Sequence, residues 1–281
     1  MIRSLMLASA AGLVMTGNSF AQTNQRRDSC EGLPSSSALK PLLAAAVKQT
    51  NGGLAFNSWA TIVANDGTVC AIAFSGGVYT DQWLASRVVS AQKASTANSL
   101  SLGKVSAGAA SANGNFALST ANLYAASQPG GNLYGLDLSN PVDTDAAYSE
   151  RNRQPANSAD FGTNQDPMIG RPIGGVSVLG GGLALYDASR GKVGGVGVGG
   201  DTSCTDHVVA WRLRRLLGLD YLKSSGVGGL AAFFSGDSAH PDNIIFDLKA
   251  GQPSGFGHPT CLNNPPIDST TNTPTSLEPV R

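Results

Sequence analysis

Charged residues are scarce in this sequence, and neither sign is in excess. Of the 281 residues, 19 are Lys or Arg and 19 are Asp or Glu, so the formal net charge is zero. Charged residues make up 14% of the chain, whereas a typical soluble domain has about 25%. Proteins that bind nucleic acid or an anionic membrane usually present a basic surface, so this composition argues against both kinds of partner.

The common signatures of catalytic and metal sites are also missing. The histidines show neither H-x-x-x-H nor H-E-x-x-H spacing, and the cysteines form no C-x-x-C pair. The segment 175–179 (GVSVL) lacks the last glycine of G-x-S-x-G. The segment 195–200 (GVGVGG) does match G-x-G-x-x-G, but the hairpin turns around it contradict the βαβ context of a dinucleotide site. A strand of small residues that lets a helix pack closely is the favoured interpretation.

The beginning of the chain has the features of an exported protein. Arg3 supplies a positive charge, residues 5–15 (LMLASAAGLVM) form a short apolar run, and residues 19–21 (SFA) form a small-x-small cleavage site. These features predict a signal peptide over residues 1–21. No other segment is apolar enough to cross a membrane, so we expect a protein that is periplasmic or secreted.

Export changes the interpretation of the four cysteines, Cys30, Cys70, Cys204 and Cys261. An even number of cysteines in an exported chain favours two disulfides over zinc or redox chemistry. Three pairings are possible, and the sequence alone does not choose among them. We favour Cys30–Cys70 with Cys204–Cys261, because each bond would pin a chain extension onto the core. Buried free thiols are the alternative.

Apolar periodicity and turn residues predict helices and strands in mixed order. In chain order these are a helix at 38–49, strands at 59–64 and 68–75, helices at 83–102 and 117–127, strands at 175–179, 183–187 and 193–198, a helix ending near 217, and a candidate late strand at 243–248. Short hairpin connections imply a five-stranded antiparallel sheet with flanking helices, which is an α+β fold. A parallel α/β fold is disfavoured, because no strand–helix–strand crossover is present.

The predicted domain spans residues 30–222 and contains a long interruption at about 103–170. This insert has little periodicity and far exceeds the usual length of a connection, which is typical of a functional loop or an insertion. A C-terminal extension at 223–262 is expected to pack on the domain. The Pro/Thr/Asn-rich tail at 263–281 is expected to be disordered.

The last glycine strand and the start of the final helix form the predicted ligand site. Gly200 would leave the backbone open to close approach, while Thr202 and Asp206 would offer polar anchors. His207 would present a neutral ring nitrogen at a helix N-terminus, where the helix dipole disfavours imidazolium. A partly exposed histidine without a ligand is the alternative.

Several motifs occur in an order that resembles one protein family. They are the Asp66-Gly67 hairpin, residues 90–97 (SAQKASTA), residues 174–178 (GGVSV), and residues 193–200 (VGGVGVGG) with Asp206 at the start of the last helix. Together they resemble the GlcG/HbpS family of haem-binding and haem-degrading-like proteins, over roughly residues 39–217. The resemblance implies a profilin-like sheet with flanking helices, homo-oligomers and, in some members, a bound haem or other small ligand. The insert, the cysteine-bearing termini and His207, where the family more usually has an acidic residue, depart from this pattern.

The leading functional hypothesis is an exported haem-binding protein in tetrapyrrole handling or redox protection. His207 would then ligate the haem iron, and a small-residue face on the helix at 83–102 would contact a second copy of the chain. One alternative is a periplasmic enzyme that acts on a small organic substrate beneath the long insert. Another is an accessory protein of a periplasmic oxidation system without chemistry of its own. Whether the protein is an enzyme stays open.

Overall fold

The computed structural model describes residues 29–103, 115–247 and 255–281. The predicted signal peptide at 1–21 lies outside these residues, as do residues 104–114 of the insert. No helix of the described part is long and apolar enough to cross a membrane.

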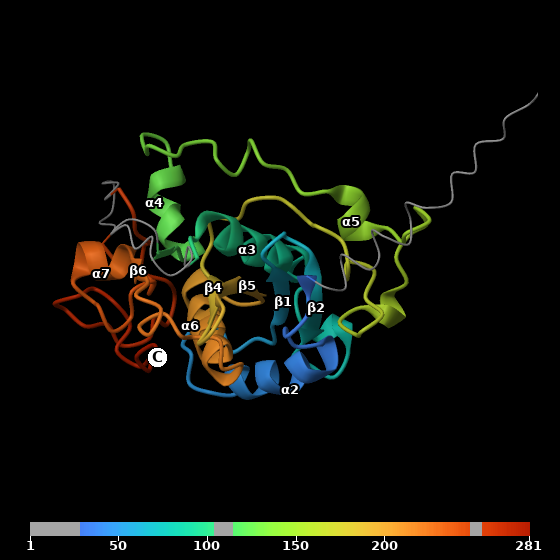
Figure 1. Ribbon diagram of the computed structural model, residues 1–281, viewed down its shortest axis with the longest axis horizontal. Coiled ribbons are helices and arrows are strands. Elements are labelled where there is room, and N and C mark those ends of the chain that lie inside the picture. Colours follow the sequence, from blue (N-terminus) through green and yellow to red (C-terminus); the bar gives the residue numbers. More distant parts are fainter. Residues whose placement is uncertain (1–28, 104–114, 248–254) are drawn as a thin grey trace, which may run out of the picture.

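The centre of the protein is an antiparallel sheet of four strands (Figure 1). The strands are β1 (Trp59–Ala64), β2 (Val69–Phe74), β4 (Gly182–Asp187) and β5 (Gly191–Gly199). Their order is β2-β1-β5-β4, and every pair is antiparallel. The α+β class and the antiparallel sheet predicted from the sequence are therefore confirmed, but the sheet has four strands instead of five.

The segment predicted as the fifth strand, 175–179, does not join the sheet. Gly174 and Gly175 adopt left-handed backbone angles, with φ of +64° and +75°, which turn the chain away from an extended path. The amide of Ser177 then donates to Oγ1 of Thr96 at 2.9 Å, so the segment is held by a helix. The late strand expected at 243–248 is likewise not formed in its described part, 243–247.

Three long helices cover the two faces of the sheet (Figure 1). Helix α3 (Ser86–Leu100) lies across one face, and helices α2 (Ser36–Val47) and α6 (Ser203–Leu216) pack on the other. Ser35 and Thr202 cap α2 and α6 with their side-chain oxygens, as is usual for helix N-termini. The predicted helix at 117–127 is reduced to a 3₁₀ turn and a single α-turn. The shorter elements are η1 (Tyr79–Asp81), β3 (Phe116–Ala117), η2 (Thr120–Leu123), α4 (Tyr124–Ser127), α5 (Thr144–Tyr148), η3 (Ser158–Asp160), β6 (Gly228–Gly229) and α7 (Leu230–Ser235).

Helix α3 packs against β5 at backbone-to-backbone distance. A Cβ atom added to Gly197 would lie 1.9 Å from the carbonyl oxygen of Ser90, and one added to Gly195 would lie 2.4 Å from that of Ala94. Only glycine fits at these two positions. The glycine pattern of residues 195–200 thus serves helix packing, and the dinucleotide motif that it matches has no βαβ unit around it.

The outer side of α3 is covered by the described part of the insert. Arg87 donates to both carboxylate oxygens of Asp166 and to the carbonyl oxygen of Ala147, and all three residues are buried. Met168 of the insert and Ile173, which follows it, belong to the same apolar cluster as residues of α3. The small-residue face of this helix is therefore used within the chain, and the predicted homo-oligomer would need another surface.

The C-terminal tail at 263–281 is packed on the domain, contrary to the predicted disorder. Leu277 and Val280 are buried in the main core. The indole nitrogen of Trp211 on α6 donates to the carbonyl oxygen of Glu278 at 3.0 Å. Two apolar side chains spaced within a polar, proline-rich stretch are enough to anchor it, and composition alone conceals such anchors.

Both disulfides have the pairing favoured from the sequence. Cys30 is bonded to Cys70 and Cys204 to Cys261, with Cα–Cα distances of 5.5 and 6.0 Å. The first bond ties the beginning of the described chain to β2, and the second ties the start of α6 to the C-terminal segment. Each therefore holds a chain extension on the core, which was the reason for favouring this pairing.

The α3–β5 contact predicts a sharp difference between two glycines of one strand. Gly197→Ala would force its Cβ against the carbonyl oxygen of Ser90, so we expect it to lower the free energy of unfolding by at least about 2 kcal/mol. Gly199→Ala is the matched control, because its Cβ would be 3.4 Å from Ser86 Cβ, an ordinary contact. Urea unfolding of both variants measures the difference. Equal losses would contradict this account of the packing.

Candidate functional site

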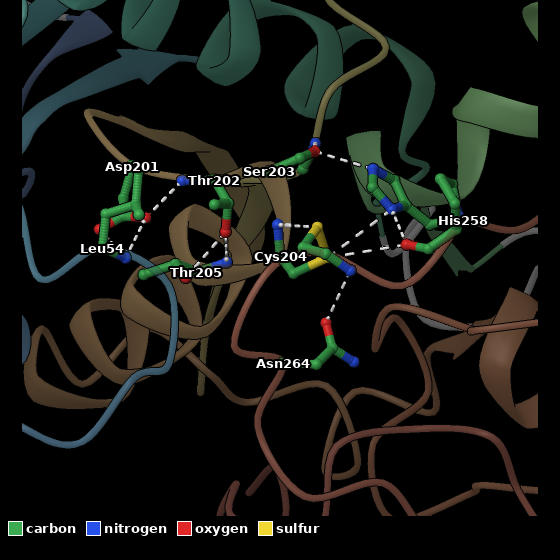
Figure 2. The surroundings of a disulfide bond; sticks show 11 residues. Leu54, Asp201, Thr202, Ser203, Cys204, Thr205, His258 and Asn264 are labelled. Atoms are coloured by element: carbon green, nitrogen blue, oxygen red, sulfur yellow. Dashed lines mark hydrogen bonds between the residues drawn. A yellow bond between two sulfur atoms is a disulfide. The ribbon is translucent and has the colours of Figure 1, made fainter.

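The structure places the predicted site residues together at the end of β5, but their polar groups face the protein. Oγ1 of Thr202 accepts a hydrogen bond from the amide of Thr205 as the cap of α6. The carboxylate of Asp201 accepts from the amide of Leu54 at 2.9 Å (Figure 2) and from the amide of Phe56 at 3.0 Å. The space beside Gly200, where a ligand was expected to approach, is taken by the backbone of Asn57. A Cβ atom added to Gly200 would lie 2.4 Å from the carbonyl oxygen of that residue.

Asp206 forms a buried ion pair with Lys93 of α3. Nζ of Lys93 lies 2.8 Å from Oδ2 of Asp206 and also donates to the carbonyl oxygen of Val198 at 2.9 Å. The other oxygen of Asp206 accepts from the amide of Asp201. Burial raises the pKa of Asp206 to about 6, and the attraction of Lys93 opposes this rise. Asp206 thus joins two helices, and because it is only 2% exposed its oxygens are closed to a ligand.

His207 does not suit the role of a haem ligand that the sequence suggested. Its side chain is fully buried, and both ring nitrogens have partners. Nδ1 lies 3.2 Å from Oγ of Ser119, while Nε2 lies 3.1 Å from Oδ1 of Asn243 and accepts from the amide of Ile244 at 3.1 Å. The ring is neutral as expected, but chiefly because burial lowers its pKa to about 4. Residues 243–244 of the C-terminal extension cover the ring, and no sequence pattern near His207 predicts that contact.

The same contacts show what His207 does in the structure. Next to it, Arg214 of α6 donates to both oxygens of the buried carboxylate of Asp242. Asn122 donates to the carbonyl oxygen of Asn243 at 2.7 Å and accepts from the amide of Ile245 at 3.0 Å. His207 is therefore part of a buried polar cluster that fastens residues 242–245 to α6 and η2.

Among the described residues, one cluster of side chains has the residue types of a metal site, but it cannot bind a metal ion in the oxidised protein. Ligand atoms of Cys204, His258 and Cys261 lie within 4.8 Å of one another. The two sulfurs are bonded to each other, so neither is available as a thiolate. His240, the remaining histidine, contacts Asp237 and the carbonyl oxygen of Leu277 and so helps to dock the tail.

A separate apolar groove lies at the C-terminal end of α3, and we call it the α3-end groove. It is bounded by Leu100, Leu102, Asn115, Phe116, Gly226, Gly228, Gly229, Ala232 and Phe233. Its volume is about 680 Å³, within the range of roughly 300–1,000 Å³ that is typical of small-molecule sites. Phe233 is 79% exposed and Leu102 is 50% exposed. Large apolar side chains gathered around a hollow are typical of a surface that binds something apolar.

Asn115 gives this groove a polar feature. Its Nδ2 donates to the carbonyl oxygen of Ser225 at 3.3 Å, but its buried Oδ1 has no hydrogen-bond partner among the described residues. A buried acceptor without a partner lowers stability by about 1–3 kcal/mol. The amide group of Asn115 is the polar part of the lining, although Oδ1 itself is buried.

The α3-end groove fits the ring of a haem but not its iron. Its walls are apolar and aromatic, which suits a flat macrocycle. The axial ligands that proteins usually provide are His, Cys, Met or Tyr, and none of these lines the groove. The described residues thus supply no iron ligand there, and none of the four predicted site residues takes part.

Comparisons with known proteins give no assignment. No family model matches the chain, and no curated protein matches it either. A solved structure of protein ORFY from Klebsiella pneumoniae, described with the family model DUF336, is 20% identical and has a TM-score of 0.36, covering 76% of this chain and 97% of its own. A solved PduOC–haem complex is 18% identical with a TM-score of 0.37, covering 71% and 94%. Likenesses this weak carry no argument, so the function must be inferred from the geometry.

The buried His207 predicts a specific dependence of stability on pH. Its pKa is about 4 in the folded chain against 6.5 when unfolded, so the unfolded state binds the proton first as pH falls. Between pH 6.5 and 4 this lowers the free energy of unfolding by up to about 3 kcal/mol. Asp206 has the opposite effect below pH 6, because its pKa is raised in the folded state.

The variant His207→Gln isolates the histidine contribution, because Asp206 is present in both proteins. Urea unfolding at several pH values should show the variant gaining stability relative to the native chain, by about 3 kcal/mol, as pH falls from 6.5 to 4. Parallel curves for the two proteins over this range would contradict the buried, neutral assignment of His207.

Proposed function

We propose that the protein is an exported binding protein that holds an apolar small molecule in the α3-end groove. The observation that carries the proposal is the apolar, aromatic wall of a groove of about 680 Å³, a volume typical of small-molecule sites. A flat apolar ligand suits this lining. The resemblance to the GlcG/HbpS family makes a tetrapyrrole the first molecule to test.

Recognition of a tetrapyrrole in this groove would depend on its ring. Leu102 and Phe233 offer apolar contact area, and burying apolar surface stabilises a complex by about 25 cal/mol per Å². Since no lining side chain can ligate iron, a metal-free porphyrin should bind about as well as hemin. This separates the proposal from the earlier hypothesis, in which His207 ligates the iron.

The compartment is part of the same proposal. Two disulfides in one chain favour an oxidising environment such as the periplasm or the exterior of the cell. The expected signal peptide at 1–21 would direct the protein there. A periplasmic or secreted binding protein would meet its ligand outside the cytoplasm.

Titration of the purified protein with hemin and with protoporphyrin IX tests the proposal. We expect both to bind with dissociation constants within about threefold of each other, a difference of less than about 1 kcal/mol. Phe233→Asp and Leu102→Asp should each weaken binding by at least about tenfold, or ~1.4 kcal/mol, because each places a charge in the apolar wall.

Two variants serve as controls for this titration. Trp83→Asp alters an apolar side chain that is 56% exposed but does not line the groove, so binding should be unchanged. His207→Gln should also bind hemin with an unchanged absorption spectrum. Loss of hemin ligation in the His207 variant, or binding that is insensitive to both groove variants, would refute the proposal.

A further inference from the structure

Ser203 and His258 form a close pair that no sequence motif indicates. Ser203 is the first residue of α6, and His258 lies 55 positions further along the chain in the C-terminal segment. Oγ of Ser203 and Nε2 of His258 are 2.8 Å apart (Figure 2). This is the distance at which a histidine can accept the proton of a serine hydroxyl.

The surroundings of the ring fix which nitrogen carries the proton. Nδ1 of His258 lies 2.7 Å from the carbonyl oxygen of Pro259 and 3.8 Å from the disulfide sulfur of Cys204. Neither of these partners can donate a proton, so Nδ1 must be the protonated nitrogen. Nε2 therefore presents its lone pair to Ser203.

The hydrogen bonds of the Ser203 hydroxyl also direct its proton toward His258. Its oxygen accepts a hydrogen bond from the amide of Gly180 at 2.6 Å, which leaves its own proton free to point at Nε2 of His258. The three groups form a directed chain from the serine hydroxyl through the imidazole to the carbonyl of Pro259. This is the arrangement of nucleophile, base and orienting group found in acyl-transfer enzymes.

The second disulfide holds the pair in place. Cys204 follows Ser203 directly, and Cys261 lies three residues beyond His258. Tyr124 packs against the imidazole with ring centroids 5.0 Å apart. The amide of Cys261 also donates to Oδ1 of Asn264 (Figure 2). Both members of the pair are thus attached to one cross-linked unit.

We infer that Ser203 and His258 are a nucleophile and general base that act on esters with an apolar acyl group. Ser203 is partly exposed, while His258 is only 3% exposed, so a reagent would meet the hydroxyl first. Leu179, next to Gly180, is 44% exposed, and Leu262, next to Cys261, is 61% exposed. These side chains offer contact area for an apolar acyl group. The inference does not depend on the function proposed for the α3-end groove.

The reaction is ester hydrolysis, and water is its only co-substrate. Oγ of Ser203 bonds to the ester carbonyl carbon as its proton passes to Nε2 of His258. The carbon–alkoxide bond then breaks, and the leaving alcohol takes that proton. Water attacks the acyl-serine with His258 as base, which releases the acid and restores both side chains. Burial, with a smaller effect of Lys93, lowers the pKa of His258, so the ring is neutral and able to act as base at pH 7.

The chain contains a matched control for this geometry. Oγ of Ser119 lies 3.2 Å from Nδ1 of His207, but both residues are almost completely buried. If a serine–histidine contact alone were sufficient, both serines would react. If accessibility and orientation decide, only Ser203 reacts.

An alkyl fluorophosphonate provides the direct test on the intact, oxidised protein. Attack by Oγ of Ser203 forms an oxygen–phosphorus bond and expels fluoride, and peptide mass spectrometry locates the adduct. We expect one adduct, on Ser203, and none in Ser203→Ala. His258→Gln should slow labelling by at least about 100-fold, which is the usual minimum for a general base. Ser119→Ala should label at the native rate.

Two further readouts keep the test independent of folding and of ligand binding. The intact mass of each variant under denaturing, non-reducing conditions reports whether both disulfides have formed. Ser203→Ala should still bind protoporphyrin IX like the native chain, because Ser203 does not line the α3-end groove. Absence of an adduct on Ser203 in the native protein would overturn the inference, as would an undiminished labelling rate in a correctly oxidised His258→Gln variant.

Discussion

The close approach of α3 to the glycine strand β5 is the contact on which the other layers of the structure depend. Because Gly197 has no side chain, the backbone of α3 lies directly against the strand. At this depth Lys93 can reach the carbonyl oxygen of Val198 and the carboxylate of Asp206 on α6, which packs on the opposite face. A buried ion pair thereby joins both helical layers, and removing one partner would leave a charge without compensation.

The C-terminal segment provides hydrogen-bond partners for buried polar groups of α6 and η2. Asp242, Asn243 and the backbone of residues 244–245 form hydrogen bonds with buried polar groups of Arg214, His207 and Asn122. This closure, with the ion pair to Lys93, explains why Asp206 and His207 in the first turn of α6 are unavailable to a ligand even though they are residue types of a binding site. Together with the second disulfide, it also brings His258 to Ser203. The extension therefore determines which polar groups near the start of α6 are buried and which remain accessible.

Local patterns in the sequence predicted the elements whose signals are local. The apolar periodicity at 38–49, the Asp66-Gly67 turn and the glycines at 195–200 identify α2, the β1–β2 hairpin and the close packing of a helix on β5. The disulfide pairing followed from the positions of the cysteines near chain extensions. The fifth strand was predicted wrongly, because the residues at 175–179 have strand propensity and only contacts with distant segments, such as the bond to Thr96, show where they lie.

The features that escaped prediction all depend on contacts between distant segments. His207 looks accessible until residues 243–244 are placed over it, and the tail looks disordered until Leu277 is seen in the core. The α3-end groove is formed where residues 116–117 pair in parallel with 228–229. No periodicity marks such a pairing over more than a hundred residues, so composition and motifs did not point to this groove.

The central claim is that the ligand site is the α3-end groove and not the residues around His207. Photo-crosslinking with a diazirine-bearing protoporphyrin, followed by peptide mass spectrometry, tests this most directly. The account predicts crosslinks to the peptides that contain Leu102 and Phe233, and their loss when unlabelled protoporphyrin IX is in excess. Competable crosslinks confined to the peptide that contains His207 would contradict it.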